Sequence, residues 1–109
     1  MKLYLKPACT TCRKAKSWLR ERGDAFEEID LNRGLSVEEL DRLIGERDYR
    51  RFLNTRNELY RERNMKANVP SRDEAIALMA KHPNLIRRPV LVKGRRVLAG
   101  FDPEEWGAA

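Results

Sequence analysis

The spacing of apolar and polar residues changes several times along this chain. The two kinds of residue alternate from Lys2 to Lys6 and again from Ala25 to Asp30, which predicts two strands. Between these segments, Ala15, Trp18 and Leu19 recur at helical spacing, which predicts a helix. A strand, a helix and a second strand form a β-α-β unit, so we expect parallel strands and a right-handed crossover.

The middle of the chain reads as helical and polar. Residues 36–39, Ser-Val-Glu-Glu, form a capping box that opens a helix ending at Gly45. The pattern predicts a second helix over about residues 48–61 and a third over about residues 71–82. We interpret this part of the chain, about residues 35–82, as a helical insertion.

Strand patterns return towards the C-terminal end. Residues 89–92 and 96–99 flank the turn Lys93-Gly94-Arg95, which predicts a β-hairpin. Asp102 followed by Pro103 has the form of an N-cap and first helical position, so a short last helix is expected. The predicted order is β-α-β, the helical insertion, a helix, a β-hairpin and a helix. It describes an α/β domain with a small four-stranded mixed sheet.

Length and charge narrow the functional classes. The 109 residues suffice for a single domain, residues 1–109, and carry a net charge of +6 from 23 Lys and Arg against 17 Asp and Glu. Basic and acidic residues are interleaved along the helical segments, which is typical of solvated helix faces with local ion pairs. We find no recognition-helix or RNA-binding signature, so direct nucleic-acid binding is not expected.

The first residues lack the apolar segment of a signal peptide, and no apolar run approaches the roughly 20 residues of a membrane span. We therefore expect a cytoplasmic protein without contact to a membrane. In that reducing compartment a close pair of cysteines is more often catalytic or sensory than structural.

The sequence Cys9-Thr10-Thr11-Cys12 lies between the first predicted strand and the first predicted helix. At a helix start, unpaired backbone N–H groups and the helix dipole favour the thiolate of the first cysteine. The second thiol lies about one turn away and can close a disulfide onto the first. A zinc site would need two more ligands from a chain whose only histidine is His82, and a structural disulfide would close a loop too small to stabilise much. We interpret the motif as a redox-active dithiol, with a vestigial or structural pair and a metal-related pair as alternatives.

A CxxC motif at the first strand–helix junction, with Pro89 at the start of the third strand, indicates a thioredoxin-like fold. In such folds the proline follows a cis peptide bond and faces the dithiol. The sequence therefore predicts a cis bond between Arg88 and Pro89.

More specifically, the chain resembles the arsenate reductase-like family of the thioredoxin-like superfamily, which includes the Spx transcriptional regulators. The resemblance rests on short matches spread over nearly the whole chain: Leu3-Tyr4, residues 7–15, Ile29-Asp30-Leu31, Asn54-Thr55-Arg56, residues 82–90 and Gly100-Phe101.

The resemblance implies roles for particular residues. Cys9 matches the family's nucleophile, and Arg56 and Arg88 match arginines that hold an oxyanion beside it. Guanidinium groups suit this role because they stay charged and bind oxyanions bidentately. Arg13 would add positive potential, and Cys12 would act as the resolving thiol. No metal or organic cofactor is implied, and thioredoxin, glutaredoxin or glutathione could serve as the external reductant.

Two departures separate this chain from the glutaredoxin-dependent arsenate reductases. Gly100 stands where those enzymes usually carry a third arginine, and Cys12 has no counterpart in most of them.

The sequence is therefore compatible with three functions. The first is a thiol–disulfide oxidoreductase acting on a thiol or disulfide substrate. The second is a Spx-like redox-sensing regulator that binds the C-terminal domain of the RNA polymerase α subunit. The third is an arsenate reductase acting on an oxyanion. Against the second, the insertion near Asp48 lacks the glycine expected at the polymerase contact, and an extension beyond Trp106 is expected in that branch.

Overall fold

The computed structural model describes residues 1–109, which form two compact units. We call them the sheet unit, Met1–Asn32 with Arg88–Ala109, and the helical unit, Arg33–Arg87. The predicted insertion, residues 35–82, lies within the helical unit.

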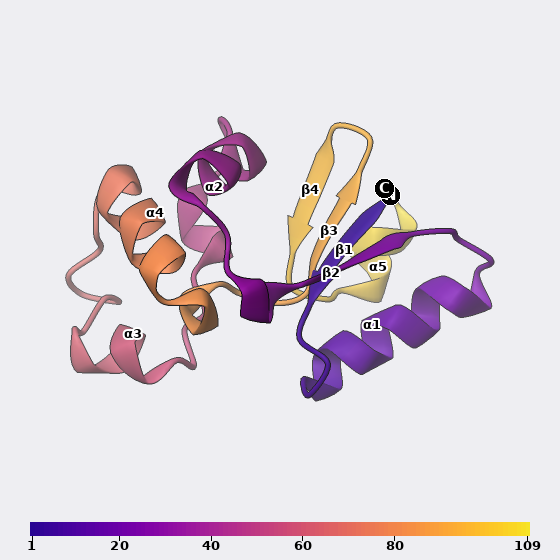
Figure 1. Ribbon diagram of the computed structural model, residues 1–109, viewed down its shortest axis with the longest axis horizontal. Coiled ribbons are helices and arrows are strands. Elements are labelled where there is room, and N and C mark those ends of the chain that lie inside the picture. Colours follow the sequence, from indigo (N-terminus) through magenta and orange to yellow (C-terminus); the bar gives the residue numbers. More distant parts are fainter. The chain divides into compact units, whose positions relative to one another are not determined.

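The sheet unit contains a four-stranded mixed sheet, as the sequence predicted (Figure 1). Its strands are β1 (Lys2–Leu5), β2 (Glu27–Asp30), β3 (Val90–Lys93) and β4 (Arg96–Ala99), in the order β2-β1-β3-β4. The predicted parallel pairing of β1 with β2 is confirmed, and β3 pairs antiparallel with both β1 and β4. Helix α1 (Thr10–Glu21) joins β1 to β2, and α5 (Pro103–Gly107) follows β4.

Strand β1 is a central strand, and its burial differs from the alternating pattern that predicted it. Lys2 is exposed, but Leu3, Tyr4 and Leu5 are all buried. The apolar cluster of the sheet unit takes residues from β1, α1, β3, β4 and α5, namely Leu3, Leu5, Cys12, Ala15, Leu19, Leu91, Leu98 and Trp106. Helix α1 is thus held against the sheet by its apolar face, with Cys12 in its first turn.

Aromatic contacts hold the end of the chain on this cluster. Trp106 is 1% exposed, and its indole Nε1 donates a hydrogen bond to the Gly100 carbonyl oxygen at 3.0 Å. The Phe101 ring meets Trp106 edge to face, with 4.9 Å between centroids, and meets Trp18 of α1 at 5.9 Å. These contacts fix the predicted last helix, whose N-cap is Asp102 as expected.

The helical unit contains α2 (Val37–Ile44), α3 (Glu58–Glu62) and α4 (Arg72–Lys81). The prediction of one helix over residues 48–61 is wrong. A short 3₁₀ turn, Tyr49–Phe52, comes first, and α3 begins only at Glu58. Backbone hydrogen bonds explain the break, because the Asn54 N–H donates to the Leu85 carbonyl at 2.7 Å and the Phe52 carbonyl accepts from the Arg87 N–H at 2.7 Å. This pairing holds the chain extended between the two helical pieces.

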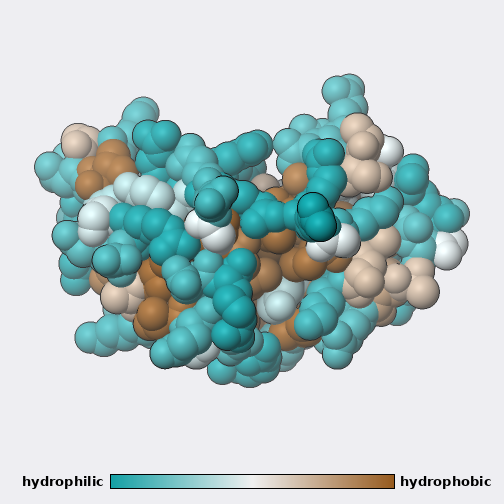
Figure 2. Space-filling view, turned by 90° about the horizontal axis from the view of Figure 1, so that it is seen from above, coloured by the Kyte–Doolittle hydropathy of each residue, from teal (hydrophilic) through white to brown (hydrophobic).

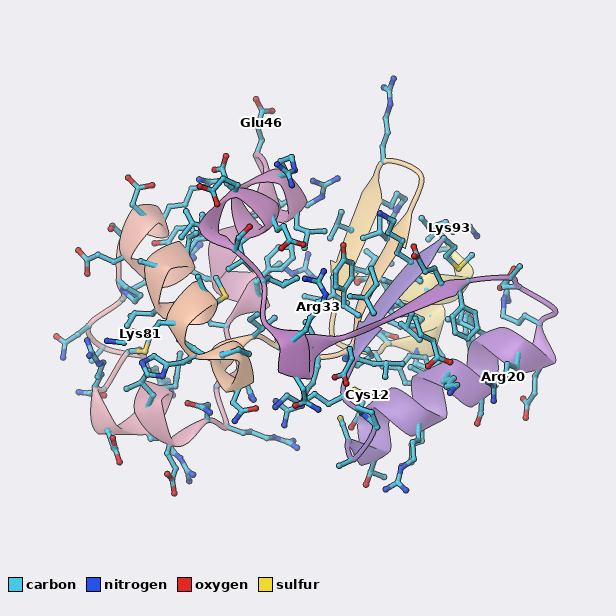
Figure 3. The ribbon with its side chains drawn as sticks, in the orientation of Figure 1. Cys12, Arg20, Arg33, Glu46, Lys81 and Lys93 are labelled. Carbon is cyan, nitrogen blue, oxygen red and sulfur yellow. The ribbon has the colours of Figure 1, made fainter.

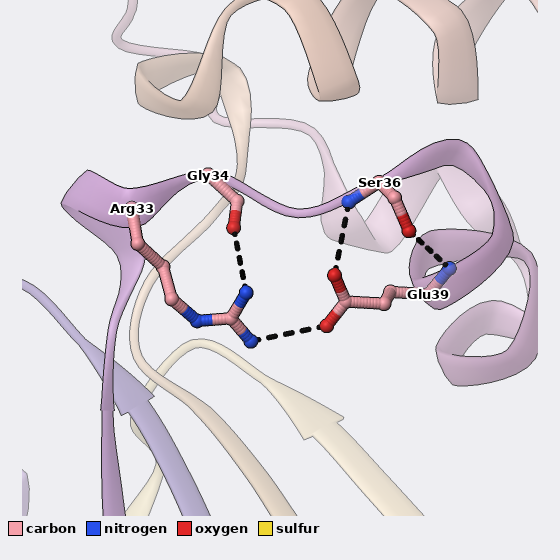
Figure 4. A network of polar contacts seen from close by, with 4 residues as sticks. All are labelled: Arg33, Gly34, Ser36 and Glu39. Carbon is pink, nitrogen blue, oxygen red and sulfur yellow. Dashed lines mark hydrogen bonds and ion pairs between the residues drawn. The ribbon is translucent and has the colours of Figure 1, made fainter.

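Polar contacts fix the ends of the helices in this unit. The predicted capping box is present at α2, where the Ser36 Oγ accepts from the Glu39 N–H at 3.1 Å and the Glu39 carboxylate accepts from the Ser36 N–H at 3.2 Å (Figure 4). Arg33 donates to the same carboxylate at 3.0 Å. At the other end of α2, Arg72 of α4 donates to the Gly45 carbonyl at 3.0 Å and to Asp41 at 2.7 Å. The carbonyl that α2 leaves unpaired at Gly45 is therefore satisfied.

The surface is mainly hydrophilic, and in Figure 2 the hydrophobic residues of the visible face are scattered among hydrophilic ones. The exposed large hydrophobic residues are Val37 and Val69, both in the helical unit. None of the helices has the length and apolar character needed to cross a membrane.

The cap of α2 leads to a prediction about stability. Replacing Ser36 by Ala removes the acceptor for the Glu39 N–H, so the free energy of unfolding should fall by about 1 kcal/mol. Urea unfolding followed by circular dichroism measures this change. The control is Ser17→Ala, because Ser17 is exposed in the middle of α1 and makes no hydrogen bond through its side chain. Equal losses of stability in the two variants would contradict the role of the cap.

Candidate active site

The first turn of α1 is built around the Cys9 sulfur. Cys9 is the N-cap residue, with φ −83° and ψ 120°, and its Sγ accepts a hydrogen bond from the Cys12 N–H at 3.3 Å. The Cys9 N–H donates to the Lys6 carbonyl at 3.1 Å, and the Cys9 carbonyl accepts from the Arg13 N–H at 3.0 Å. The sulfur therefore takes the place that a serine or aspartate oxygen usually takes at a helix start.

The two thiols differ in access to solvent. Both cysteines are free, and Cys9 is partly exposed whereas Cys12 is 1% exposed. Figure 3 labels Cys12 at the start of α1, and its thiol belongs to the apolar cluster with Leu3 and Leu5. An external disulfide can therefore reach Cys9, while Cys12 is positioned to react with its neighbour.

The two thiols also differ in acidity. Partial burial raises the pKa of Cys9, but hydrogen bonds from the Cys12 thiol and the Cys12 N–H, together with Arg88, outweigh it and hold the pKa below its ordinary value. The pKa of Cys12 is raised to about 12, above all by burial, and also by the hydrogen bond with Cys9 and the negative charge of the Cys9 thiolate. The Lys6 N–H and Arg88 oppose this shift. At neutral pH the pair is one accessible, acidified thiol beside one protonated donor.

Arg88 is the charged side chain that acts on both thiols. It hydrogen-bonds Cys9 and lowers the pKa of that thiol. Its Nε and Nη1 atoms are buried without any hydrogen-bond partner in the protein. Leaving such donors unpaired costs on the order of 1–3 kcal/mol each. The predicted cis peptide bond between Arg88 and Pro89 is confirmed, and Pro89 is buried.

The other two predicted arginines have different surroundings. Arg13 is exposed on α1 and is not among the main causes of the pKa shift of Cys9. Arg56 belongs to the helical unit, where it is exposed and its N–H donates to the Asn54 Oδ1 at 3.1 Å. Its predicted role beside the nucleophile stays a prediction.

Sequence reasoning missed Lys6 as a part of this site. Its carbonyl oxygen accepts from the Cys9 N–H, and its N–H hydrogen-bonds the Cys12 thiol. Both contacts use backbone atoms, so the residue type gives no signal for them. No group of three or more His, Cys, Asp or Glu side chains is arranged to hold a metal ion.

The unequal thiols lead to a prediction about alkylation. Iodoacetamide reacts with thiolate, so the rate follows the ionised fraction of each cysteine. Cys9 should be labelled with a midpoint below its ordinary pKa, and Cys12 should stay nearly unlabelled across the range from about pH 5 to about pH 10. Mass spectrometry of peptides from the labelled protein measures both rates. Equal rates for the two thiols would contradict the assignment.

Paired arginine variants show which charge matters. Arg88→Gln removes a group that lowers the pKa of Cys9, so the labelling midpoint should move to higher pH. Arg13→Gln removes the same charge from an exposed position and should leave the midpoint nearly unchanged. A larger shift in the Arg13 variant would reverse this ranking.

Comparison with known proteins places the chain in a family. The model of the ArsC family matches residues 4–109. The global transcriptional regulator Spx of Enterococcus faecalis is 31% identical over 106 residues, covering 94% of this chain and 80% of the regulator. The protein YusI of Bacillus subtilis is 39% identical over 108 residues, covering 94% of this chain and 92% of that protein. The structure of arsenate reductase from Vibrio cholerae has a TM-score of 0.81 at 35% identity and covers 96% of this chain and 94% of its own. The chain has the thioredoxin-like fold of these proteins and belongs to the ArsC family.

Proposed function

We propose that this chain is a thiol–disulfide oxidoreductase in which Cys9 attacks and Cys12 resolves. The observation that carries the proposal is the asymmetry of the two thiols. Cys9 is accessible and has a lowered pKa, whereas Cys12 is buried and has a raised pKa. An attacking thiol must be ionised and within reach, and a resolving thiol needs only to reach its neighbour.

In the first step the Cys9 thiolate attacks one sulfur of a substrate disulfide. A bond forms between that sulfur and the Cys9 Sγ, the substrate S–S bond breaks, and the second substrate sulfur leaves as a thiolate that takes a proton from water. Arg88 supports this step because its positive charge lowers the pKa of Cys9 and so favours the thiolate.

In the second step Cys12 attacks the Cys9 Sγ. The Cys12 thiol gives its proton to water, a bond forms between the Cys12 and Cys9 sulfurs, and the bond between Cys9 and the substrate sulfur breaks. The released substrate thiolate takes up a proton from water. The mixed disulfide prepares this step, because Cys9 no longer carries a negative charge. Two contributions that raise the pKa of Cys12, its hydrogen bond with Cys9 and the Cys9 charge, are then lost. The opposing effects of the Lys6 N–H and Arg88 persist, so Cys12 becomes more acidic once it is needed.

One turnover reduces the substrate by two electrons and leaves Cys9 and Cys12 as a disulfide. An external dithiol or two thiols must then reduce the protein, and thioredoxin, glutaredoxin or glutathione would serve. The proposed place of this reaction is the cytoplasm, where such reductants are maintained.

The exchange mechanism predicts opposite results for the two cysteine variants. Cys9→Ser should abolish reduction of a model disulfide, since the attacking sulfur is lost. Cys12→Ser should stop turnover but accumulate a mixed disulfide at Cys9, because the resolving thiol is lost. A coupled thioredoxin or glutaredoxin assay measures turnover, and non-reducing mass spectrometry measures the adduct. Full turnover by Cys12→Ser would rule out Cys12 as the resolving thiol.

A Spx-like regulator is a second candidate, favoured by the regulators of that name among the relatives. In that case the same dithiol would act as a sensor, and the partner would be the C-terminal domain of the RNA polymerase α subunit. Titration of the protein with this domain, in the reduced and in the oxidised state, tests the candidate. Tight binding without disulfide exchange would replace the oxidoreductase proposal.

Arsenate reduction is the third candidate, and we expect poor or absent turnover. Gly100 stands at the position of the family's third arginine and has φ 80°, a conformation that favours glycine over any residue with a side chain. Loss of one charge-assisted contact costs about 1.5–3 kcal/mol, or roughly 10- to 150-fold in binding. Arsenate-dependent oxidation of NADPH in a coupled assay measures the activity. Efficient turnover would place arsenate reduction first.

A further inference from the structure

The helical unit has a surface pocket that takes no part in the chemistry of the two cysteines. Its volume is about 480 Å³, and its lining residues are Thr55, Tyr60, Arg61, Asn64 and Lys66. They come from α3 and the segments on either side of it. After α3 the chain turns back, with the Asn64 N–H donating to the Arg61 carbonyl and the Met65 N–H to the Tyr60 carbonyl, both at 3.0 Å. Met65 is 3% exposed and anchors this turn, so the pocket has a fixed wall.

The pocket carries positive charge that nothing in the protein neutralises. The side chains of Arg61 and Lys66 are exposed and make no hydrogen bond or ion pair. Some other basic residues of the chain are paired, since Arg20, Arg50 and Arg72 each form an ion pair with a carboxylate. No acidic residue lines the pocket, although α3 also carries Glu58 and Glu62.

The remaining lining residues define what kind of anion would fit. Thr55 and Asn64 supply a hydroxyl and an amide, which hydrogen-bond the oxygen atoms of a phosphate. Tyr60 is half-buried and supplies an aromatic wall, to which a planar ring can stack. The volume lies within the range of small-molecule sites, about 300–1,000 Å³, and is much larger than one phosphate group needs.

A neighbouring pocket of the same unit serves as a contrast. Its volume is about 570 Å³, and its lining includes Arg63 but also Glu74, so its charge is mixed. A phosphate would meet a carboxylate there, and we assign no anion to it.

We propose that the pocket of Thr55, Tyr60, Arg61, Asn64 and Lys66 binds a small phosphate monoester that carries a planar ring, such as a nucleoside monophosphate. The phosphate is held by Arg61 and Lys66, and the ring lies against Tyr60. This site goes beyond the proposed oxidoreductase function and does not depend on it, because none of its residues belongs to the thiol chemistry.

Titration of the full-length, reduced protein with four probes tests the proposal. The probes are adenosine monophosphate, ribose 5-phosphate, inorganic phosphate and adenosine, each followed by amide chemical shifts at low ionic strength. Adenosine monophosphate should bind tightest, ribose 5-phosphate more weakly, and inorganic phosphate and adenosine weakest. The shifts should centre on residues 55–66. Equal affinity for adenosine and its monophosphate would overturn the assignment, as would shifts centred outside the pocket.

Matched variants show whether adenosine monophosphate binds to this pocket or to basic residues of the surface in general. Arg61→Gln and Lys66→Gln should each weaken binding of adenosine monophosphate about tenfold, since each loses one charge-assisted contact. Arg63→Gln is the control, because Arg63 is exposed on the same turn and lines the other pocket. Tyr60→Leu should leave the affinity for ribose 5-phosphate unchanged. It should lower the affinity for adenosine monophosphate to about the same value. Circular dichroism checks that each variant is folded.

Three further results would decide against the proposal. Equal weakening by Arg61→Gln and Arg63→Gln would show that only the overall charge matters. Tighter binding of a short single-stranded oligonucleotide than of adenosine monophosphate would make the surface a nucleic-acid contact. If binding changed with the oxidation state of Cys9 and not with substitution of Arg61 or Lys66, the phosphate would be bound at the thiol site. Disulfide exchange should be unaffected in all the pocket variants, so a failure here leaves the proposed function intact, and the reverse also holds.

Discussion

A backbone amide in the first turn of α1, that of Cys12, donates its hydrogen bond to the sulfur of Cys9. This contact caps the helix and stabilises negative charge on the sulfur at the same time, because an N–H group at a helix start needs an acceptor and prefers an anionic one. The position of α1 is set in turn by the apolar cluster beneath it, to which Cys12 itself belongs. The reactivity of the accessible thiol therefore depends on the same packing that holds the helix on the sheet.

Two features of this arrangement, at Arg88 and at Cys12, are unfavourable in the resting protein. The Nε and Nη1 atoms of Arg88 are buried and have no hydrogen-bond partner in the protein, which is unfavourable for a guanidinium group. A thiol whose pKa is raised to about 12 is a poor nucleophile in the resting protein. In the proposed exchange, attachment of a substrate sulfur to Cys9 would remove the effect of the Cys9 charge on the pKa of Cys12. Strain of this kind is expected where a fold serves chemistry more than stability.

The two units differ in how their residues are brought together and in the residues they carry. The sheet unit brings together residues from both ends of the chain and carries Cys9, Cys12 and Arg88. The helical unit is a continuous segment stabilised by helix caps and by the contacts of Arg72 with Asp41 and Gly45. The basic residues Arg61 and Lys66, which have no ion pair, lie in and directly after α3. A second binding function can thus be carried by the insertion without altering the residues that build the thiol site.

The sequence alone determined the local features of this protein. Short-range signals, such as the capping box at Ser36 and the motif from Cys9 to Cys12 after a strand, fix their elements because each is satisfied by atoms a few residues away. The order of elements and the family resemblance predicted the cis bond before Pro89.

The tertiary structure decided the features that depend on contacts between segments far apart in the sequence. The helix expected over residues 48–61 is interrupted because Asn54 and Phe52 hydrogen-bond a segment some thirty residues further on. The acidity of each thiol likewise depends on burial and on Arg88, which approaches from the far end of the chain, and no local pattern encodes such a neighbour.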